Sequence, residues 1–468
     1  MVFSSQVFIF FFLPLFLLCF YLAPRFLRVA VLTLFSYVFY GWWDWRFLFL
    51  IVFSTFVDYF CGLRIARTDS QSVRKKFVTL SIITNLLLLG FFKYFMFLSS
   101  AMNDIFTVAG MHYPQTLLDF KVILPVGISF YTFQSMSYTI DIYRQQAKPT
   151  KNFLDFACYI SMFPQLVAGP IVRYSHIERQ LRNPEYSLAQ FYYGLQYFIV
   201  GLAKKVIIAD SVSSISDMYF NAPSPLGYST VDTLVAILAY TVQIYFDFSG
   251  YSDMAIGLGL FCGLSFPINF DSPYKAKSLS EFWRRWHITL SSWLRDYLYI
   301  PLGGSRRGKL LTYRNLAITM LLGGLWHGAS WNFVIWGGFH GGMLAVERML
   351  GERNPLRLLS DAGQQMVTFA LVAFAWIFFR ASDLSFSLQT IQRLGAFDFH
   401  RNLLLQNASS LHVAALVLGL FLIFCARNTS EWLPRALYVK TFFLAFLFIV
   451  SLSFLFGAVS HPFLYFQF

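Results

Sequence analysis

The stretch that decides the fold reads LAITMLLGGLWHGASWNFVIWGGFHGGMLAV, from residue 316 to residue 346. Arg314 lies on one side of this apolar run and Glu347 on the other. The run is long for one membrane span of about 20 residues and too short for two straight ones. Because glycines interrupt it at seven positions, it is interpreted as a broken or tilted helix. Irregular backbone at membrane depth is tolerated only where it is buried in protein or lines a cavity, so the run predicts a site inside the membrane.

His327 lies within this run, 13 residues after Arg314. On an ideal helix that spacing is about 20 Å, which is near mid-depth of a hydrocarbon core of about 30 Å. An ionisable side chain at that depth is costly and by default marks a functional site. We therefore predict that His327 is catalytic. His340 lies 13 residues further along, would face roughly the opposite side of a continuous helix, and is assigned a structural role.

The composition indicates a membrane protein. Hydrophobic residues make up 57% of the chain and charged residues 13%, whereas a soluble domain carries about 25% charge. We predict an all-α, polytopic integral membrane protein with a single transmembrane domain over residues 1–468. It should have about 10–12 transmembrane helices plus re-entrant and interfacial helices. The five cysteines show no metal-ligand spacing, so neither a bound metal nor a disulfide is predicted.

Positive charges orient the first crossings. Arg25 and Arg28 follow the first apolar segment, and five basic residues between 64 and 76 follow the third. If these loops are cytoplasmic, the amino terminus lies outside. Arg173 would then emerge on the wrong face if residues 153–172 crossed the membrane. A re-entrant hairpin is therefore predicted there.

Residues 273–315 form a basic segment, in which nine Lys or Arg residues lie between 275 and 314. Amphipathic periodicity over residues 281–299 predicts one helix at the cytoplasmic interface, with Ser278 and Glu281 as a capping box. The segment is either a topology signal that holds anionic lipid or a basic mouth that attracts a phosphorylated donor, such as a coenzyme A thioester. The candidate donor-binding residues are Arg284, Arg285, Arg295, Arg306 and Arg307.

Other polar residues in apolar surroundings are further candidates. His287 lies on the aromatic face of the predicted helix, where a structural role is favoured. Asp247 and Asp253 flank Gly250 and could orient a histidine, bind a substrate hydroxyl or form a structural ion pair. The remaining substrate-binding candidates are Asn269, in a turn before the basic segment, and Trp326, beside His327.

A neutral imidazole in a dry cavity can take a proton from a hydroxyl as that hydroxyl attacks a thioester carbonyl. Such acyl transfer yields an ester and needs neither an enzyme cysteine nor a metal. The longest polar stretch, about residues 381–408, is too short for a soluble domain, so work on an extracellular polymer requires a separate partner. The aromatic tail at residues 461–468, HPFLYFQF, is typical of an interface anchor, Tyr465 included.

Several blocks resemble the membrane-bound O-acyltransferase (MBOAT) superfamily. They are YFDFSGYSDMAIGLG (245–259), EFWRRWHITLSSWLRDYLYIPLGG (281–304) and LLGGLWHGASW (321–331). Two more blocks, LPVGISFYTFQSMSYTIDIYR (124–144) and FPQLVAGPIVR (163–173), are similar to the branch that contains alginate and peptidoglycan O-acetyltransferases. The resemblance runs along the whole chain and implies the MBOAT fold.

The resemblance also implies roles. His327 matches the family's invariant histidine, where a cytoplasmic funnel meets an outward-facing one, and His287 matches a second histidine of the bacterial members. Acetyl-coenzyme A is the implied donor, with no bound cofactor, and a periplasmic or membrane-anchored acetyltransferase partner would modify the polysaccharide. Tyr465 matches a tyrosine in an aromatic tail proposed as an acyl relay. The implied location is the bacterial inner membrane, among membrane lipids and with no nucleic-acid partner.

The resemblance does not choose the polymer. The chain is short for an alginate enzyme, which keeps peptidoglycan as an acceptor. The same fold could also use another donor or acceptor, such as D-alanine and teichoic acid. A different class, a proton-coupled transporter or flippase, would use buried histidine and aspartate residues as proton relays.

Overall fold

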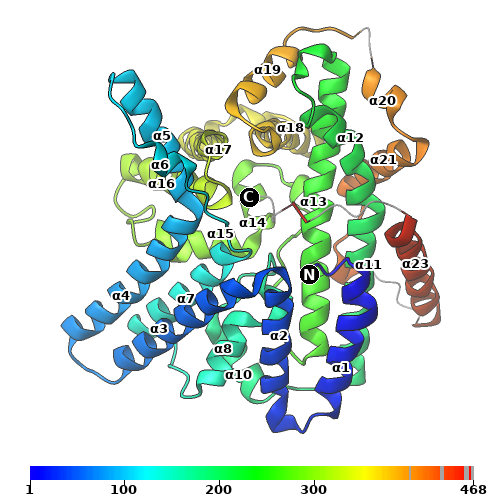
Figure 1. Cartoon of the computed structure of the whole chain (residues 1–468). Helices are drawn as coiled ribbons and strands as arrows, with labels where there is room; N and C mark the ends of the chain where they lie inside the picture. Colours follow the sequence, from blue (N-terminus) through cyan, green and yellow to red (C-terminus); the bar gives the residue numbers. More distant parts are fainter. Residues whose placement is uncertain (400–401, 433–436, 458–462, 465–468) are drawn as a thin grey trace. The chain divides into compact units, whose positions relative to one another are not determined.

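The computed structural model describes residues 1–399, 402–432, 437–457 and 463–464. Within these ranges every regular element is a helix and none is a strand (Figure 1). The prediction of an all-α fold is therefore confirmed. The chain divides into two compact units, one of residues 1–194 with 258–266 and the other of residues 195–257 with 267–468. The single domain over residues 1–468 stays a prediction.

The first unit contains the amino-terminal helices. Their bounds are α1 (Leu13–Leu22), α2 (Arg28–Asp44), α3 (Leu48–Ala66), α4 (Gln71–Leu89), α5 (Phe95–Val108), α6 (Gln115–Asp119), α7 (Ile128–Tyr143), α8 (Phe153–Ser161), α9 (Phe163–Leu166) and α10 (Tyr174–Arg182). Aromatic rings join them: Phe163 lies 5.3 Å from Phe12 and 5.0 Å from Phe16 between ring centroids. Its backbone N–H donates to the Ser36 hydroxyl of α2 at 3.0 Å.

Residues 153–172 do not form a spanning helix. α8 has nine residues and α9 has four, and all residues from 156 to 172 are buried. A nine-residue helix is roughly 14 Å long, less than half of a hydrocarbon core of about 30 Å. The segment therefore does not form one straight spanning helix, and the re-entrant hairpin stays a prediction.

The second unit contains the remaining helices and every described residue of the candidate site. Their bounds are α12 (Asp210–Phe220), α14 (Leu279–Arg285), α15 (Ile288–Leu294), α16 (Lys309–His327), α17 (Trp331–Leu350), α18 (Asp361–Arg380), α19 (Leu384–Leu394), α20 (Leu403–Asn407), α21 (Ser410–Cys425), α22 (Thr429–Trp432) and α23 (Leu437–Gly457). α11 (Leu188–Ala203) and α13 (Thr230–Phe261) contribute residues to both units.

Several helices suit a membrane. In the described ranges, five stretches are long and apolar enough to cross one: Arg25–Ala66, Gln71–Val108, Thr230–Phe261, Asp361–Arg380 and Tyr438–Gly457. Phe8–Leu22 and Ser410–Cys425 are shorter apolar helices. Large apolar side chains such as Phe11 and Phe49 are about 70% exposed on these helices, which is typical of a lipid-facing surface. The figure of 10–12 crossings stays a prediction.

The run from 316 to 346 forms two helices, α16 and α17, which pack as an antiparallel pair and extend beyond the run into its polar flanks. A Cβ at Gly324 would collide with the carbonyl oxygen of Phe333, and a Cβ at Gly337 would collide with that of Met320. The glycines therefore let two backbones approach closely. The interpretation of this run as one broken or tilted helix is wrong.

Residues 281–299 are also interrupted. α14 ends before His287, α15 begins after it, and a π-helical turn covers Arg295–Tyr299. His287 has φ 42° and ψ 54°, in the left-handed region where residues other than glycine are uncommon. The prediction of one continuous amphipathic helix is wrong. The predicted cap is confirmed, because the Ser278 hydroxyl oxygen accepts a hydrogen bond from the Glu281 N–H at 3.1 Å.

Candidate active site

His327 is the last residue of α16, at the turn of the helical hairpin. Gly328 follows in extended backbone, and a Cβ at that position would collide with the ring of Phe333. Ser330 then leads into α17. Glycine at 328 thus allows the chain to turn tightly, and the turn fixes His327 at the buried end of the hairpin.

The His327 imidazole is enclosed by aromatic rings and is 4% exposed. The rings lie edge-on, with centroids 5.0 Å away for Trp326, 5.2 Å for Trp336 and 5.1 Å for Phe379. The hairpin returns His340 to the same cluster, 4.8 Å from Trp336. The expectation that the two histidines face opposite sides of one helix is therefore wrong, although His340 keeps a structural contact as acceptor from the Trp283 indole N–H at 3.3 Å.

A cavity connects His327 to the protein surface. Its volume is about 250 Å³. Its walls include Leu290, Leu294, Thr319, Met320 and Leu344, with His327 at a buried position. Arg295 and Arg348 also line it and are exposed, so the cavity opens at the surface. The catalytic candidate is therefore reachable and not sealed in the apolar interior.

A second, more polar cavity shares Leu316, Leu344 and Arg348 with the first, so the two are adjacent. Its volume is about 450 Å³. Lys277 and Arg357 line it, but each is paired with a carboxylate. Arg348 has neither a hydrogen bond nor an ion pair within the described ranges. Arg348 lines both cavities, and its cationic side chain makes it a candidate to bind an anion there.

His287 caps the start of α15 and is fully buried. The Asn269 Oδ1 accepts hydrogen bonds from the Thr289 N–H at 3.3 Å and the Thr289 hydroxyl at 2.8 Å. The same oxygen lies 3.2 Å from His287 Nδ1. Because an oxygen acceptor faces Nδ1, this nitrogen carries the proton and Nε2 is the basic nitrogen. Asn269 thus orients His287.

Trp326 lies between the two histidines. Its ring centroid is 5.0 Å from that of His327 and 6.0 Å from that of His287. Trp326 itself is buried. The structure therefore brings together four of the predicted residues, His327, His287, Trp326 and Asn269, although they come from three separate segments of the chain.

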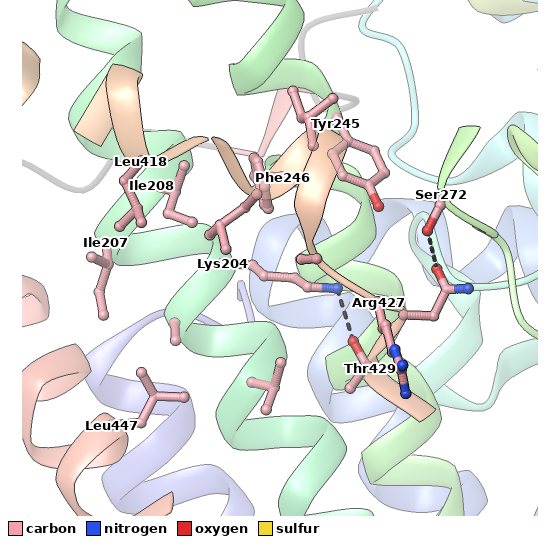
Figure 2. Close-up of a pocket in the computed structure, with 16 residues that line it drawn as sticks. Lys204, Ile207, Ile208, Tyr245, Phe246, Ser272, Leu418, Arg427, Thr429 and Leu447 are labelled. Carbon is pink, nitrogen blue, oxygen red and sulfur yellow. Dashed lines mark hydrogen bonds between the residues drawn. The ribbon is translucent and has the colours of Figure 1, made fainter. Parts of the chain in front are cut away.

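Asp253 forms an ion pair with a lysine. Lys204 Nζ lies 2.6 Å from the Asp253 carboxylate and donates to the Thr429 hydroxyl at 2.9 Å. Figure 2 shows this lysine extending toward Thr429 beside a largely apolar cavity that also contains Tyr245 and Phe246. Neither histidine lines that cavity. Of the three alternatives for Asp253, the structural ion pair fits these contacts.

Asp247 is also paired with a lysine. Lys205 Nζ lies 2.7 Å from Asp247 Oδ1 and 2.6 Å from Asp210 Oδ1, and all three side chains are buried. The second carboxylate oxygen of Asp247 accepts a hydrogen bond from the backbone N–H of Leu464 at 2.9 Å. Tyr465, the next residue, lies outside the described residues, so its predicted role stays a prediction.

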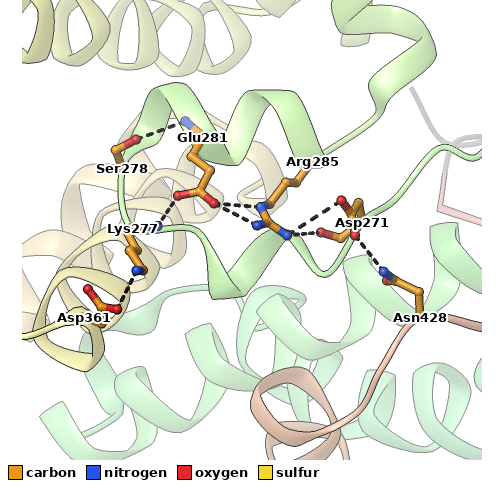
Figure 3. Close-up of polar contacts among 7 residues, drawn as sticks. All are labelled: Asp271, Lys277, Ser278, Glu281, Arg285, Asp361 and Asn428. Carbon is orange, nitrogen blue, oxygen red and sulfur yellow. Dashed lines mark hydrogen bonds and ion pairs between the residues drawn. The ribbon is translucent and has the colours of Figure 1, made fainter. Parts of the chain in front are cut away.

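Most of the predicted donor-binding arginines do not line either of the two adjacent cavities. Arg285 is 2.8 Å from the Glu281 carboxylate and donates to the Asp271 carbonyl at 3.1 Å (Figure 3). Arg284 donates to the Ser280 hydroxyl at 3.2 Å. Arg306 and Arg307 are exposed in the loop before α16. Of the five predicted arginines, Arg295 alone lines the cavity that reaches His327.

Glu281 is the acceptor at the centre of this network (Figure 3). Partial burial by itself would raise the pKa of Glu281. The backbone N–H of Lys277, which donates to it at 2.9 Å, and the Arg285 guanidinium outweigh that effect. They hold the pKa of Glu281 below its ordinary value, so the network is complete only when this carboxylate is ionised.

Sequence reasoning missed three kinds of residue. Arg348 follows Glu347 in the polar flank of the apolar run and was not predicted, because its place in the cavity depends on the hairpin. Trp336 belongs to the same hairpin. Lys204 and Lys205 gave a signal that could have been used, since two adjacent lysines in an apolar segment require partners, and Asp247 and Asp253 were the available carboxylates.

A family comparison decides the assignment. The model of the MBOAT, membrane-bound O-acyltransferase family, matches residues 92–388, more than half of the chain. The chain belongs to the membrane-bound O-acyltransferase family. This confirms the resemblance in the sequence blocks, and with the apolar helices it identifies a multi-pass membrane protein.

Curated relatives of this MBOAT protein carry acyltransferase names. The probable alginate O-acetylase AlgI of Pseudomonas aeruginosa is 44% identical over 422 residues, which cover 90% of this chain and 80% of the relative. The peptidoglycan O-acetyltransferase of Helicobacter pylori is 36% identical, and the match covers 100% of this chain and 98% of the relative. The teichoic acid D-alanyltransferase of Streptococcus thermophilus is 30% identical over 48% of this chain and 56% of the relative. The MBOAT protein is therefore an O-acyltransferase.

Proposed function

We propose that this acyltransferase moves an acetyl group from acetyl-coenzyme A in the cytoplasm across the bacterial inner membrane, for O-acetylation of an envelope or secreted polysaccharide. The observation that carries the proposal is the position of His327 at the buried part of a cavity that opens at Arg295 and Arg348. A base with access to a phosphorylated donor is the minimum that such a transfer needs.

The shape of the two cavities supports a long donor with a charged end. The inner cavity is mostly apolar and suits an acyl-pantetheine arm, which would bring the thioester to His327. The outer cavity is polar and suits the nucleotide part. Arg348, which lines both cavities, would bind a phosphate, because a guanidinium matches phosphate geometry with paired hydrogen bonds.

In the proposed reaction, His327 accepts a proton from an acceptor hydroxyl while the hydroxyl oxygen attacks the acetyl carbonyl carbon. The carbon–sulfur bond then breaks, and the imidazolium returns the proton to the departing thiolate as coenzyme A leaves. The products are an acetyl ester and a free thiol. His287, fixed by Asn269 with Nε2 as its basic nitrogen, would assist proton movement close to His327.

The first acceptor is proposed to be the phenol of Tyr465, which would carry acetyl as an aryl ester to a periplasmic or membrane-anchored partner. A phenol has an ordinary pKa near 10 and needs a base to become a nucleophile, which is the role proposed for His327. The partner would transfer the acetyl group to a sugar hydroxyl, and the Tyr465 phenol would be restored.

Two polysaccharides compete as final acceptors, alginate-like polymers and peptidoglycan. The alginate relative is the more identical, whereas the peptidoglycan relative matches along nearly its whole length. D-Alanyl transfer to teichoic acid is the alternative, supported by a relative that matches about half of this chain.

Inner-membrane vesicles with labelled acetyl-coenzyme A test the transfer. His327→Ala should lower acetyl transfer by about 10²- to 10⁴-fold, the contribution of a general base, while insertion and thermal unfolding stay unchanged. His112→Ala replaces an exposed histidine outside the site and should leave the rate unchanged. A transporter would consume no thioester, and an inert scaffold would be insensitive to His327→Ala; either result would overturn the proposal.

The polymer is identified by measuring ester-linked acetate on peptidoglycan and on secreted polysaccharide, with and without this gene. Acetate should disappear from one of the two when the gene is deleted. Mass spectrometry of the carboxy-terminal peptide during turnover should detect one acetyl group on Tyr465. Unchanged acetate on both polymers would exclude both acceptors.

A further inference from the structure

Two residues of the aromatic tail are buried in the second unit. Phe463 is 0% exposed and Leu464 is 6% exposed. The Phe463 ring stacks on Tyr251 of α13 at 4.4 Å and contacts Phe248, one helical turn before it, at 5.9 Å. The Leu464 N–H donates to Asp247 Oδ2 at 2.9 Å. One stretch of α13 therefore holds Phe463 and Leu464 by both ring packing and a hydrogen bond to a charged acceptor.

Asp247 is suited to this contact because its other oxygen is fixed. Lys205 Nζ lies 2.7 Å from Asp247 Oδ1 and 2.6 Å from Asp210 Oδ1. Two carboxylates surround one ammonium, so the cluster has an excess of one negative charge. A buried carboxylate requires donors on its remaining lone pairs, and the Leu464 N–H supplies one. The ion pair with Lys205 thus fixes the Asp247 carboxylate so that its second oxygen faces the Leu464 N–H.

The helices that carry this cluster approach each other at two glycines. A Cβ at Gly201 would lie 2.5 Å from the Gly250 carbonyl oxygen, and a Cβ at Gly250 would lie 2.6 Å from that of Gly201. A π-helical turn over Lys204–Ala209 follows, and such turns often occur at functional sites. The close approach lets Lys205 reach Asp247.

The contact continues from the tail to the histidines. Phe248 contacts Phe463 and lies 4.7 Å from the His287 ring. His287 and His327 are joined through Trp326. The point where the tail docks is therefore one aromatic ring away from the second histidine.

We propose that Asp247, held by Lys205, is the docking point that positions the carboxy-terminal segment 463–468 for acyl transfer. Asp247 and Lys205 are positioning residues: they act on the tail, and neither lines the cavity that reaches His327. Docking itself is independent of the chemistry, and its effect on acetyl transfer rests on the proposed function.

Digestion of the purified full-length protein with carboxypeptidase A, followed by intact-mass analysis, measures docking directly. In the wild type, trimming should stop before Leu464 and remove at most the four residues that follow it. Asp247→Ala and Phe463→Ala should each allow removal of Leu464, after which Pro462 stops the enzyme. Asp247→Asn keeps an acceptor oxygen and should protect Leu464 better than Asp247→Ala does.

Asp253→Ala is the matched control, because Asp253 pairs with the adjacent Lys204 on the same two segments and makes no hydrogen bond to Phe463 or Leu464, the described residues of the tail. It should leave the trimming pattern as in the wild type. Phe463→Ala leaves the ion cluster intact, so it carries the test if Asp247→Ala fails to fold. Protection of Leu464 in the folded Asp247→Ala and Phe463→Ala variants would overturn the docking proposal.

Kinetics separate positioning from a merely structural role. Asp247→Ala should lower kcat for acetyl transfer roughly ten- to hundredfold, as expected for the loss of a hydrogen bond to a charged group, with KM for acetyl-coenzyme A unchanged. Asp247→Ala and Phe463→Ala should be non-additive, because both act through the same segment. If the double variant instead lowered kcat by the product of the two single effects, the proposal would be overturned. If trimming changes as expected but the wild type transfers no acetyl, docking stands and the proposed function fails.

Discussion

His327 and Arg348 occupy different parts of one cavity, and each has the side chain that its place requires. His327 is enclosed by aromatic rings at the turn of the hairpin. Arg348 is exposed and lines both adjacent cavities. The proposed function needs both, a base for the transfer and a cation for the phosphate of the donor.

Arg348→Ala should weaken donor binding and leave the chemical step intact. We expect KM for acetyl-coenzyme A to rise about tenfold, which corresponds to about 1.4 kcal/mol, the lower end for a hydrogen bond to a charged group. The kcat should change little, because the lost contact would be made in both the bound and the transition state. Arg353→Ala, an exposed arginine that lines neither cavity, is the control. A fall in kcat with unchanged KM would contradict this assignment.

The two residues also differ in how far the sequence could predict them. His327 is an ionisable residue in an apolar run, which is a signal that one segment carries by itself. Arg348 lies at a polar flank, where arginine is ordinary, and it lines the cavity only because α17 folds back on α16. Asn269 and His287 are 18 residues apart in the chain, and their side chains meet at 3.2 Å. His287 adopts a left-handed backbone conformation there, which no residue pattern around it predicts.

The helical hairpin of α16 and α17 depends on glycines at its contact surface. Gly324→Ala should lower the free energy of unfolding by about 1–3 kcal/mol, because a methyl group would meet the Phe333 backbone, which cannot move aside as a side chain can. Gly342→Ala in α17 is the matched control, since nothing lies within 4 Å of its Cβ position. It should be neutral or stabilising by up to about 1 kcal/mol. Thermal unfolding in detergent measures both, and equal effects would contradict close packing at Gly324.

The segment around α14 should be sensitive to acid through Glu281. Its folded-state pKa is below the ordinary value of 4.5, so the stabilisation is complete above 4.5 and is lost as the pH falls through the lowered pKa. Wild-type protein should therefore lose more thermal stability between pH 7 and pH 4 than Glu281→Gln does. Glu352→Gln, at an exposed carboxylate, should lose as much as the wild type. Identical losses of thermal stability in all three proteins would show that ionised Glu281 does not stabilise this segment.

At the scale of elements, helix starts were easier to predict than helix breaks. The cap at Ser278 and Glu281 is encoded within four residues and is confirmed. The break at His287 depends on Asn269, which accepts the Ile288 N–H through its backbone at 2.9 Å. Likewise, glycines in an apolar run indicate either a broken helix or a close contact between two helices. These alternatives can be distinguished only once the helix that packs against the glycines is known.

For the whole molecule, composition was sufficient to predict an all-α membrane protein, because 57% hydrophobic residues with 13% charge cannot cover a soluble surface. The motifs then identified the family, which the match over residues 92–388 confirms. The number of crossings could not be fixed in the same way. The short buried helix α8 is as apolar as helices long enough to span a membrane, such as α13 and α18, and only its length in the folded chain distinguishes it.

The tail can serve a periplasmic partner only if the carboxyl terminus faces the periplasm. With the amino terminus outside, as the basic loops predict, the chain must then cross an even number of times. Alkaline phosphatase fused after residue 468 should be active, and a fluorescent protein fused there, which folds in the cytoplasm, should be dark. The opposite pattern would place the terminus in the cytoplasm and rule out the relay by Tyr465.

The glycine contact between α11 and α13 limits how this enzyme can change. Since neither Gly201 nor Gly250 can accept even a methyl group without displacing the opposite backbone, a substitution at either position would move the two helices apart. The walls of the His327 cavity, such as Leu290 and Leu294, are the positions where an engineer could widen acyl selectivity without disturbing the anchor for the tail.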